Sequence, residues 1–567
     1  MTASTTIPAS DPITLEVVRN KLDGIANEMQ STLVRSSFSP IVKEGLDASA
    51  SLFTLEGETL AQATAIPIHL ATLIPVVRTV LGRFPVAEMR EGDIYIMNDP
   101  YLGGTHLPDI ALVMPIFSAG RPIALSAAMT HHQDVGGMSP GSVPPNATEI
   151  FQEGIRIPPL KFRDAGEVNR TLVDLLCLNV RVPETFMGDL NAQVAACSIG
   201  ARRVAELAER YGANRLPALT GELLARSEQL VRRAVERLPD GRYSYVDWLD
   251  NDGVDLDELV RIEVAIEIAG DRVTIDFAGT SPQVRGPFNC VPSGACAGAY
   301  FAVLAMSDPS IPINGGCFRP IELRLPEGSL VNPREPAPVN SRTSTIKRIA
   351  GTIIGALRQA RPEDAPADAA AALHVLAFGG AREDGSRYVV GELIAAGSGA
   401  SRGRDGVDVI ETDGSNCMNL PVEALEMDVP IRVHRSELRA DSGGRGSYRG
   451  GLGISREYEV LAGDVVFTHR GERHRRPARG AAGGDSGACA HSVIRRADGA
   501  EEVIPSKTLV RLAPGDRVEV NTAGGGGYGD PADRPADLLA ADLAGGKVGE
   551  ASWSAPAAAP TPAAGDD

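Results

Sequence analysis

The chain has 567 residues and a formal net charge of −18, from 55 Lys and Arg against 73 Asp and Glu. No Lys/Arg-rich run offsets this acidity, which argues against a nucleic-acid-binding protein. The hydrophobic share of 43% and the charged share of 23% are those of an ordinary globular protein, and no apolar run is long enough to span a membrane. The first residues resemble no secretory signal, so we expect a cytoplasmic protein without membrane contacts.

Apolar periodicity in the first half predicts alternating helices and strands. Asp11 and Pro12 are suited to begin a helix, and apolar residues then recur every three or four positions to Leu33. Two apolar runs separated by a Gly-Arg-Pro turn predict a β-hairpin. The predicted elements are helices at 12–33, 184–211 and 219–237, strands at 49–53 and 93–97, and the hairpin strands 110–117 and 123–129.

The second half changes its period and then its composition. From Val260 apolar and polar residues alternate, which predicts a second hairpin over 260–277. Helices are predicted at 295–306, 345–357 and 368–378, before a glycine-punctuated, β-rich stretch that reaches about residue 521. Beyond Ala532 the sequence is rich in Ala, Pro and Asp, which favours a disordered tail.

Together these patterns predict a mixed α+β fold with a large multi-layer core of antiparallel hairpins and helices and a β-rich C-terminal region. We divide the chain into four regions. They are a site-bearing α+β region at 1–245, a hairpin and helical region at 246–390, a glycine-rich β region at 391–531 and the tail at 532–567.

Histidines and carboxylates cluster around the first hairpin. Three of the nine histidines lie between positions 106 and 132. His106 and Asp109, three residues apart on a turn into a strand, can direct an imidazole and a carboxylate at one point. His131 and His132 end the next strand, and because adjacent strand residues face opposite sides, only one of them should share that point. Asp99 and Asp134 flank the group.

Two histidines with one or two carboxylates are suited to Zn²⁺, Mn²⁺ or Fe²⁺, and with one coordination position open they are suited to metal-assisted hydrolysis. The alternative is structural: His106 and His131 could be hydrogen-bonded loop histidines, and the aspartates could cap turns. The spacing alone leaves both interpretations open.

Other candidate features are weaker. The glycine run from Thr522 to Asp530 is followed by no helix pattern and no lysine, so a structural loop is favoured over an anion cradle, and no Walker-type phosphate loop occurs elsewhere. Cys290 and Cys296 have no histidine close in sequence, which favours buried core thiols over nucleophiles. The seven cysteines contain no C-x-x-C pair and are expected to be reduced.

Arg342 is a candidate for an anion or interface contact, with a surface salt bridge as the alternative. His469 and His474 lie among arginines, which would repel a metal cation, so we expect them in a loop or at a subunit surface.

Nine motifs carry a resemblance to a known family. They are Glu44–Phe53, Gly92–Asp109, His131–Gly137, Gln152–Pro159, Asn179–Pro183, Gly188–Gln193, Asp276–Ser281, Tyr448–Gly453 and Gly524–Pro531. In this order, over about residues 11–531, they resemble the hydantoinase B/oxoprolinase family. This family is similar to the B-type chain of ATP-dependent hydantoinases, the C-terminal part of 5-oxoprolinases, and one of the chains of acetone and acetophenone carboxylases.

The resemblance implies a division of labour between two chains. A hydantoinase A-type partner would bind ATP and Mg²⁺ and phosphorylate the substrate oxygen, and this chain would complete the conversion at a divalent metal, Zn²⁺ or Mn²⁺, in a hetero-oligomer such as α2β2. The implied metal ligands are Asp47, His106, Asp109 and His131, with His132 and Asp99 supporting them. Asp134 or Glu153 could accept the proton of the attacking water, and the sequence does not choose between them.

Three functions follow from these observations. The leading one is hydrolytic ring opening of a cyclic amide such as hydantoin, N-methylhydantoin or 5-oxoproline. The alternative within the family is a role as one chain of an acetone- or acetophenone-type carboxylase. A third possibility is a non-catalytic chain that stabilises the ATPase partner, although a scaffold has no need of the four predicted ligands together.

Overall fold

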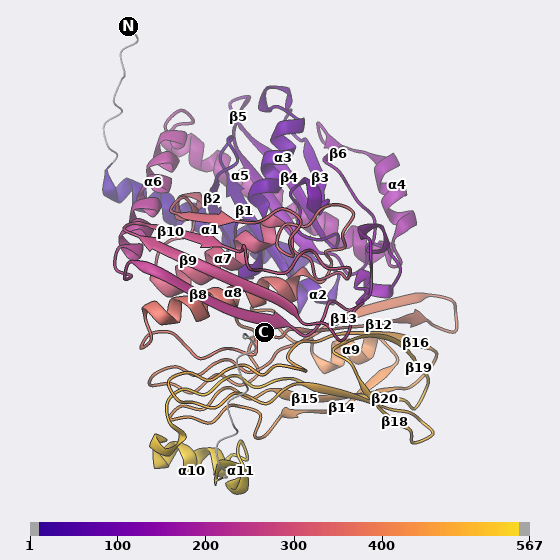
Figure 1. Cartoon of the computed structure of the whole chain (residues 1–567). Coiled ribbons are helices and arrows are strands. Elements are labelled where there is room, and N and C mark those ends of the chain that lie inside the picture. The colour runs from indigo at the N-terminus through magenta and orange to yellow at the C-terminus, as the bar shows by residue number, and fades with distance from the viewer. Residues whose placement is uncertain (1–10, 555–567) are drawn as a thin grey trace.

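The computed structural model describes residues 11–554, which form a mixed α+β fold (Figure 1). The elements of the N-terminal part, indigo to magenta, occupy the upper part of the view, and the orange and yellow C-terminal elements lie below them. The predicted fold class is confirmed. No helix within residues 11–554 is long and apolar enough to cross a membrane.

The upper part is built on a seven-stranded sheet of order β2-β1-β5-β4-β3-β6-β7, in which all neighbours are antiparallel. Its centre is the predicted first hairpin, β4 with β5. The strands are β1 (Ala48–Phe53), β2 (Thr59–Gln62), β3 (Ile94–Met97), β4 (Asp109–Ser118), β5 (Arg121–His131), β6 (Leu160–Asp164) and β7 (Glu167–Val168).

Helices cover both faces of this sheet. Helix α1 begins where predicted, because the Asp11 carboxylate accepts a hydrogen bond from the Thr14 amide. The helices are α1 (Pro12–Ser36), α2 (Pro40–Lys43), α3 (Leu73–Arg83), α4 (Arg170–Asn179), α5 (Pro183–Tyr211), α6 (Leu216–Val235), α7 (Pro292–Ser307), α8 (Arg342–Ala360), α9 (Val422–Asp428), α10 (Ala536–Ala544) and α11 (Glu550–Ser554).

The residues of β5 alternate between the two faces of the sheet. Ala127 and Met129 pack in a cluster with residues of α3, whereas Ala128 belongs to the main core with residues of α1 and α5. This alternation continues to the end of the strand and decides how the two neighbouring histidines are oriented.

A second sheet, of order β11-β10-β9-β8, packs against α8. Its strands are β8 (Gly241–Leu249), β9 (Val260–Ala269), β10 (Arg272–Asp276) and β11 (Ile321–Arg324). Strands β9 and β10 are the predicted second hairpin. One hydrophobic core includes residues on both sides of the boundary predicted at residue 245, and the division into four regions remains a prediction.

The lower part contains two further sheets, of orders β13-β12-β16-β19 and β14-β15-β20-β17-β18. Their strands are β12 (His374–Ala381), β13 (Arg387–Ile394), β14 (Ile431–Leu438), β15 (Ile454–Val460), β16 (Val465–Arg470), β17 (His491–Arg495), β18 (Glu501–Ile504), β19 (Lys507–Leu512) and β20 (Arg517–Asn521). Short 3-10 helices, among them η1 (Pro67–His69), complete the fold.

The helix predicted at 368–378 is wrong. Alanine favours a helix there, but the segment is extended and leads into β12. Its amides instead bond to loops distant in sequence: Ala367 donates to the carbonyl of Ala400, and Ala370 to that of Gly397. These tertiary hydrogen bonds override a weak local propensity.

Glycines fill the space between the loops of the lower part. In the run Gly524 to Gly527, a Cβ atom would lie 1.8 to 2.1 Å from the carbonyl oxygen of Ser442, Ser398, Arg479 or Arg445 in turn. Positions 524 and 527 therefore face the same neighbouring segment, and the two residues between them face others. Since the backbones touch directly, the glycine run is a packing element, as the structural interpretation predicted.

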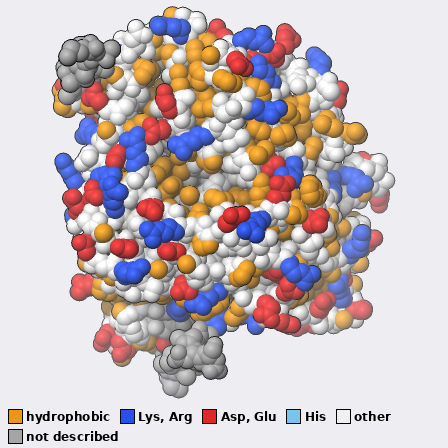
Figure 2. All heavy atoms as spheres, turned by 45° about the horizontal axis from the view of Figure 1, so that its top comes forward, with side chains coloured by type: hydrophobic (Ala, Val, Ile, Leu, Met, Phe, Trp, Pro, Cys, Tyr) orange, Lys and Arg blue, Asp and Glu red, His pale blue; other side chains and the backbone are white. Residues whose placement is uncertain are grey.

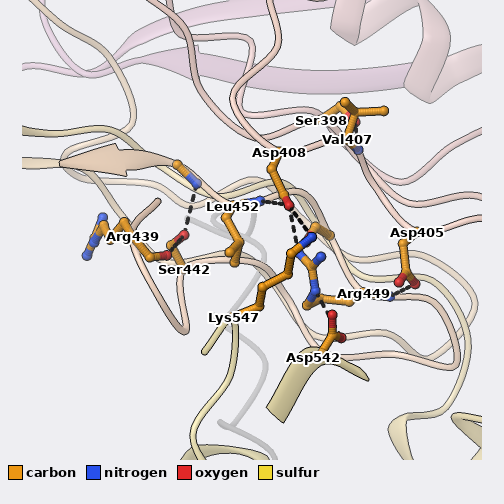
Figure 3. A network of polar contacts seen from close by, with 12 residues as sticks. Ser398, Asp405, Val407, Asp408, Arg439, Ser442, Arg449, Leu452, Asp542 and Lys547 are labelled. Atoms are coloured by element: carbon orange, nitrogen blue, oxygen red, sulfur yellow. Dashed lines mark hydrogen bonds and ion pairs between the residues drawn. The ribbon is translucent and has the colours of Figure 1, made fainter. Parts of the chain in front are cut away.

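The expected disordered tail is wrong for residues 536–554, which form α10 and α11; residues 555–567 lie outside the described part of the chain. Two buried arginines, Arg449 and Arg534, hold α10 in place, and Figure 3 shows the contacts of Arg449. Arg449 donates to Asp542 of α10 (3.2 Å) and to Asp408 (3.0 Å), and Arg534 pairs with Asp542 and Asp405. The composition of the tail, rich in Ala and Pro, could not predict these ion pairs.

Candidate metal centre

Three strand ends converge at one edge of the seven-stranded sheet. Asp109 and His131 are direct cross-strand partners on β4 and β5. On the other side of β5, the His131 amide donates to the carbonyl of Asp47, which immediately precedes β1 (3.1 Å). His106 lies on the turn before β4. The antiparallel register therefore gathers residues from three separate sequence motifs.

Their side chains meet closely. His106 Nε2 lies 2.9 Å from Asp109 Oδ1 and 3.2 Å from His131 Nδ1, and His131 Nδ1 lies 3.4 Å from the same carboxylate oxygen. One ligand atom from each of the three residues falls within 4.8 Å of the others. Asp47 Oδ2 approaches His131 Nδ1 at 3.9 Å. The structure thus brings together the four residues predicted as ligands.

A fifth residue, His69, was missed by reasoning from the sequence. Its Nε2 atom lies 3.8 Å from Asp47 Oδ1 and 3.6 Å from Asp109 Oδ2, and its Nδ1 atom lies 3.1 Å from Ser49 Oγ. Only the strand pairing could have revealed that His69 lies near Asp47. Because β2 runs antiparallel to β1, the chain that leaves β2 returns to the end of β1 where Asp47 lies. No fixed spacing in sequence marks this relation.

The protonation states of His106 and Asp109 favour the binding of a cation. His106 Nδ1 donates to the carbonyl oxygen of Asn340 (2.9 Å), so a neutral ring presents the lone pair of Nε2 to Asp109. Burial, together with the nearby Arg342, lowers the pKa of His106 to about 3 and keeps the ring neutral.

Burial alone would raise the pKa of Asp109, but the charges and hydrogen bonds around it, including the Arg342 guanidinium, hold it well below its usual range. The Nε2 atom of His106 and the carboxylate oxygen of Asp109 therefore face each other at 2.9 Å. His69 Nε2, also buried, has no hydrogen-bond partner. This set of converging lone pairs fits a divalent cation.

The other predicted site residues lie outside this cluster. His132 faces the opposite side of the sheet, where its Nε2 donates to the Gln193 side chain on α5 (3.1 Å). Burial lowers the pKa of His132. Asp99 binds the Arg156 guanidinium (2.8 Å) and the amide of Tyr101. Neither His132 nor Asp99 contacts the cluster directly.

The two carboxylates predicted as general bases are engaged elsewhere. Asp134 accepts from the amides of Gly136 and Gly141 and pairs with Arg181 (2.9 Å), so it holds the loop after β5. Glu153 accepts from the amides of Val339 and Asn340 (3.2 and 2.8 Å). Glu153 thereby positions the carbonyl that orients His106, and burial raises its pKa to about 8.

The cluster lies at one end of a cavity between the upper and lower parts of the molecule. The cavity has an empty volume of about 660 Å³, open solvent included. Asp47, His106 and His131 are among its polar lining residues, and aliphatic residues line much of it: Ile41, Ile66, Ile68, Val143, Leu373, Val375, Leu376 and Leu393. On the surface view, hydrophobic side chains gather toward the top and middle, whereas charges of both signs are scattered (Figure 2).

Two buried arginines also line the cavity. Arg342, at the start of α8, pairs with Asp109 and donates to Thr343. It is therefore neither a surface salt bridge nor remote from the cluster. Arg470, the last residue of β16, donates through one nitrogen to Asn340 Oδ1 and Ser341 Oγ (both 2.9 Å).

The remaining candidates are structural. His469 is buried in β16 beside His374, so the expectation of a loop or subunit surface is wrong for His469. His474 lies in the loop after β16, as expected, and is partly buried against the same two histidines. Burial raises the pKa of Cys290 to about 12 and that of Cys296 to about 11, as expected for core thiols. All seven cysteines are free.

Comparison with known proteins identifies the family. The model of the Hydantoinase B/oxoprolinase family matches residues 11–531. The chain belongs to this family. The beta chain of the caprolactamase of Pseudomonas jessenii is 36% identical over 552 residues, covering 95% of this chain and 94% of that one. A chain in the crystal structure of the ATP-dependent caprolactamase from the same organism superposes with a TM-score of 0.89 at 33% identity, covering 95% of both chains.

Two further relatives extend the comparison. The B-type chain of a putative D-/L-hydantoinase from Pseudomonas sp. (strain NS671) is 34% identical over 558 residues, covering 95% of this chain and 93% of that one. A chain of nucleotide-free acetone carboxylase superposes with a TM-score of 0.89, covering 96% of this chain and 79% of that one. At 22% identity this second likeness concerns the fold alone.

Proposed function

We propose that this chain is the metal-carrying component of an ATP-dependent enzyme that hydrolyses a cyclic amide, after a partner chain has phosphorylated the amide oxygen. The observation that carries the proposal is the convergence of His106, Asp109 and His131, with Asp47 and His69, at a cavity that Asp47, His106 and His131 line. The likeness to chains of caprolactamase and hydantoinase supports the reaction class.

The chemistry explains the need for two chains. An unstrained amide is a poor electrophile, and transfer of a phosphoryl group to its oxygen makes the carbon electron-poor. Water then adds to this carbon, the ring C–N bond breaks, and the nitrogen leaves with a proton; a second water hydrolyses the acyl phosphate to carboxylate and phosphate. No Walker-type phosphate loop occurs in this sequence, which agrees with ATP and Mg²⁺ being bound by a hydantoinase A-type partner.

Asp47, His106, Asp109 and His131 would hold the cation, Zn²⁺ or Mn²⁺, and His69 would complete or support the set. Bound there, the cation would act as a Lewis acid and increase the acidity of water. Asp47 is the carboxylate of the cluster that also lines the cavity, so we assign proton acceptance to the Asp47 oxygen that would not bind the cation, rather than to Asp134 or Glu153.

The partner and assembly follow from the same argument. We propose a hetero-oligomer with an A-type chain, such as α2β2, in which each cavity lies beside a phosphorylating site. The cavity accounts for a small-molecule substrate, and hydantoin, 5-oxoproline and caprolactam are the compounds to test first.

Co-expression with the A-type partner tests the proposal. The complex should open one of these rings only with ATP, and the product amino acid can be measured by mass spectrometry. His106→Ala should remove both metal and turnover without dissociating the complex. Ring opening by the A-type partner alone would identify this chain as a scaffold, and dependence on bicarbonate with a ketone substrate would identify a carboxylase.

A further inference from the structure

The two arginines of the cavity differ in how their charges are balanced. Arg342 is neutralised by Asp109. Arg470 is 5% exposed, and among the described residues no carboxylate forms an ion pair with it. Its Nη1 atom donates to two neutral oxygens, and its Nε atom has no partner. The guanidinium of Arg470 therefore lines the cavity with a positive charge that has no ion-pair partner among the described residues and with an N–H donor that has no acceptor.

No carboxylate of the surroundings pairs directly with Arg470 among the described residues. Glu153 lies close enough to influence Arg470, but both of its oxygens accept backbone amides of Val339 and Asn340. Burial lowers the pKa of Arg470 to about 9, which still leaves it charged at neutral pH. A buried guanidinium without an ion-pair partner is costly, and an anionic ligand that reached it would offset this cost.

The position of Arg470 relates this charge to the metal centre. Arg470 binds the side chains of Asn340 and Ser341, and the Asn340 carbonyl accepts the hydrogen bond that orients His106. The next residue along the chain is Arg342, which pairs with Asp109. One loop therefore connects the free guanidinium to two members of the cluster.

We propose that Arg470, assisted by Arg342, is the binding site for the phosphoryl oxyanion of the activated substrate, whose apolar body lies against the aliphatic wall of the cavity. The inference rests on the proposed function and specifies the ligand as a small molecule with one oxyanionic group and a hydrocarbon ring or chain. A planar guanidinium donates paired hydrogen bonds to phosphoryl oxygens, which a lysine cannot reproduce.

Butylphosphonate serves as the probe, because it joins a phosphonate to a four-carbon chain and cannot be hydrolysed. Its binding to the full chain is measured by calorimetry before and after chelator treatment, so that contact with metal is separated from contact with arginine. Pentanoate offers the same chain on a carboxylate, and inorganic phosphate offers the anion without the chain. We expect one binding site, with butylphosphonate at least about tenfold tighter than either.

Arg470→Gln should weaken butylphosphonate binding at least about 30-fold, the loss typical of a desolvated charge-assisted contact, and Arg470→Lys should restore only part of it. The matched control is Arg511→Gln, which removes an exposed arginine from β19, the strand that pairs with β16. Unchanged binding in Arg470→Gln, or an equal loss in Arg511→Gln, overturns the proposal. Tighter binding of pentanoate than of butylphosphonate overturns the phosphoryl assignment in favour of a substrate carboxylate.

A crystal structure of the wild-type chain with 3-bromopropylphosphonate avoids reliance on a variant that fails to fold. The phosphonate oxygens should lie within hydrogen-bond distance of the Arg470 guanidinium, with the bromine near Val375 and Leu393. A phosphonate bound elsewhere overturns the proposal. Because neither measurement needs turnover, arginine-dependent binding in a complex that opens no ring would refute the proposed function and leave the oxyanion site standing.

Discussion

Two regions solve opposite packing problems: the candidate metal site at the edge of the upper sheet, here called the metal edge (Asp47, His69, His106, Asp109 and His131), and the glycine run of the lower part (Gly524 to Gly527). At the metal edge, apolar strands place a few polar side chains at one point, and the backbone stays in a regular ladder. In the glycine run the side chains are absent, and carbonyl groups of neighbouring segments occupy the space where Cβ atoms would be. The structure of the metal edge depends on which side chains are present, and the packing of the glycine run depends on the lack of side chains.

This difference determines what a substitution does. At the metal edge, a single replacement should remove a function and leave the fold largely intact, because the strands are held by many neighbours. In the glycine run, any side chain must displace backbone, so even the smallest replacement should act on folding before it acts on chemistry. Substitutions in the two regions test this contrast, beginning with the largest effect.

Gly525→Val should leave little folded protein. Its Cβ atom would lie 1.9 Å from the Ser398 carbonyl oxygen, which belongs to backbone and cannot rotate away. We expect a loss of more than about 4 kcal/mol in the free energy of unfolding, measured by urea denaturation of whatever remains soluble. Gly82→Ala is the control, because Gly82 lies in α3 with no atom within 4 Å of the new Cβ and should be neutral or slightly stabilising. Equal effects of the two would end the comparison.

His131→Ala should abolish activity and reduce metal affinity by more than about 100-fold, exceeding the loss usual for residues that only support a ligand. His132→Ala should retain the metal, because His132 faces α5 and donates to Gln193. Its cost should appear as about 1–3 kcal/mol of stability, since the buried Gln193 oxygen loses its donor. Metal content and urea unfolding of both variants decide the point. Loss of metal confined to His132→Ala would reverse the assignment of the two faces.

Apolar runs, turn residues and alternation predicted the parts of the fold that local sequence specifies. The hairpin of β4 and β5 followed from two apolar runs separated by a turn, and the hairpin of β9 and β10 followed from period-two alternation. The spacing of His106 and Asp109 marked the site, and the family resemblance selected His131 over His132. His69 could not be found this way, because only the pairing of β1 with β2 brings it to Asp47. The segment 368–378 was assigned by alanine content to a helix, although its partners lie in loops near residues 397–400. Contacts between residues distant in the sequence cannot be predicted from the local sequence pattern.

Asp542→Ala should destabilise the lower part by about 2–3 kcal/mol. Arg449 and Arg534 are buried, and the substitution removes one carboxylate from each while leaving Asp408 and Asp405 as remaining partners. The control is Asp537→Ala, an exposed change on the same helix, which should cost less than about 1 kcal/mol. Urea unfolding monitored by circular dichroism compares them. Equal stabilities would mean that α10 contributes nothing to the glycine-rich region it contacts.

His69→Ala should weaken metal binding about tenfold, less than His131→Ala, because the His69 Nε2 atom stands 3.6 Å or more from both carboxylates while His106 and His131 approach Asp109 more closely. Competition with a chelator of known affinity measures the change. Ser49→Ala provides the matched test, since it removes only the hydroxyl 3.1 Å from His69 Nδ1 and leaves the ring in place. If His69 is a direct ligand, its loss will equal that of His131, and Ser49→Ala will have a small effect. If His69 only supports the ligands, the losses of metal affinity in His69→Ala and Ser49→Ala will both be much smaller than the loss in His131→Ala. The metal edge will then remain a set of four ligands from three strand ends.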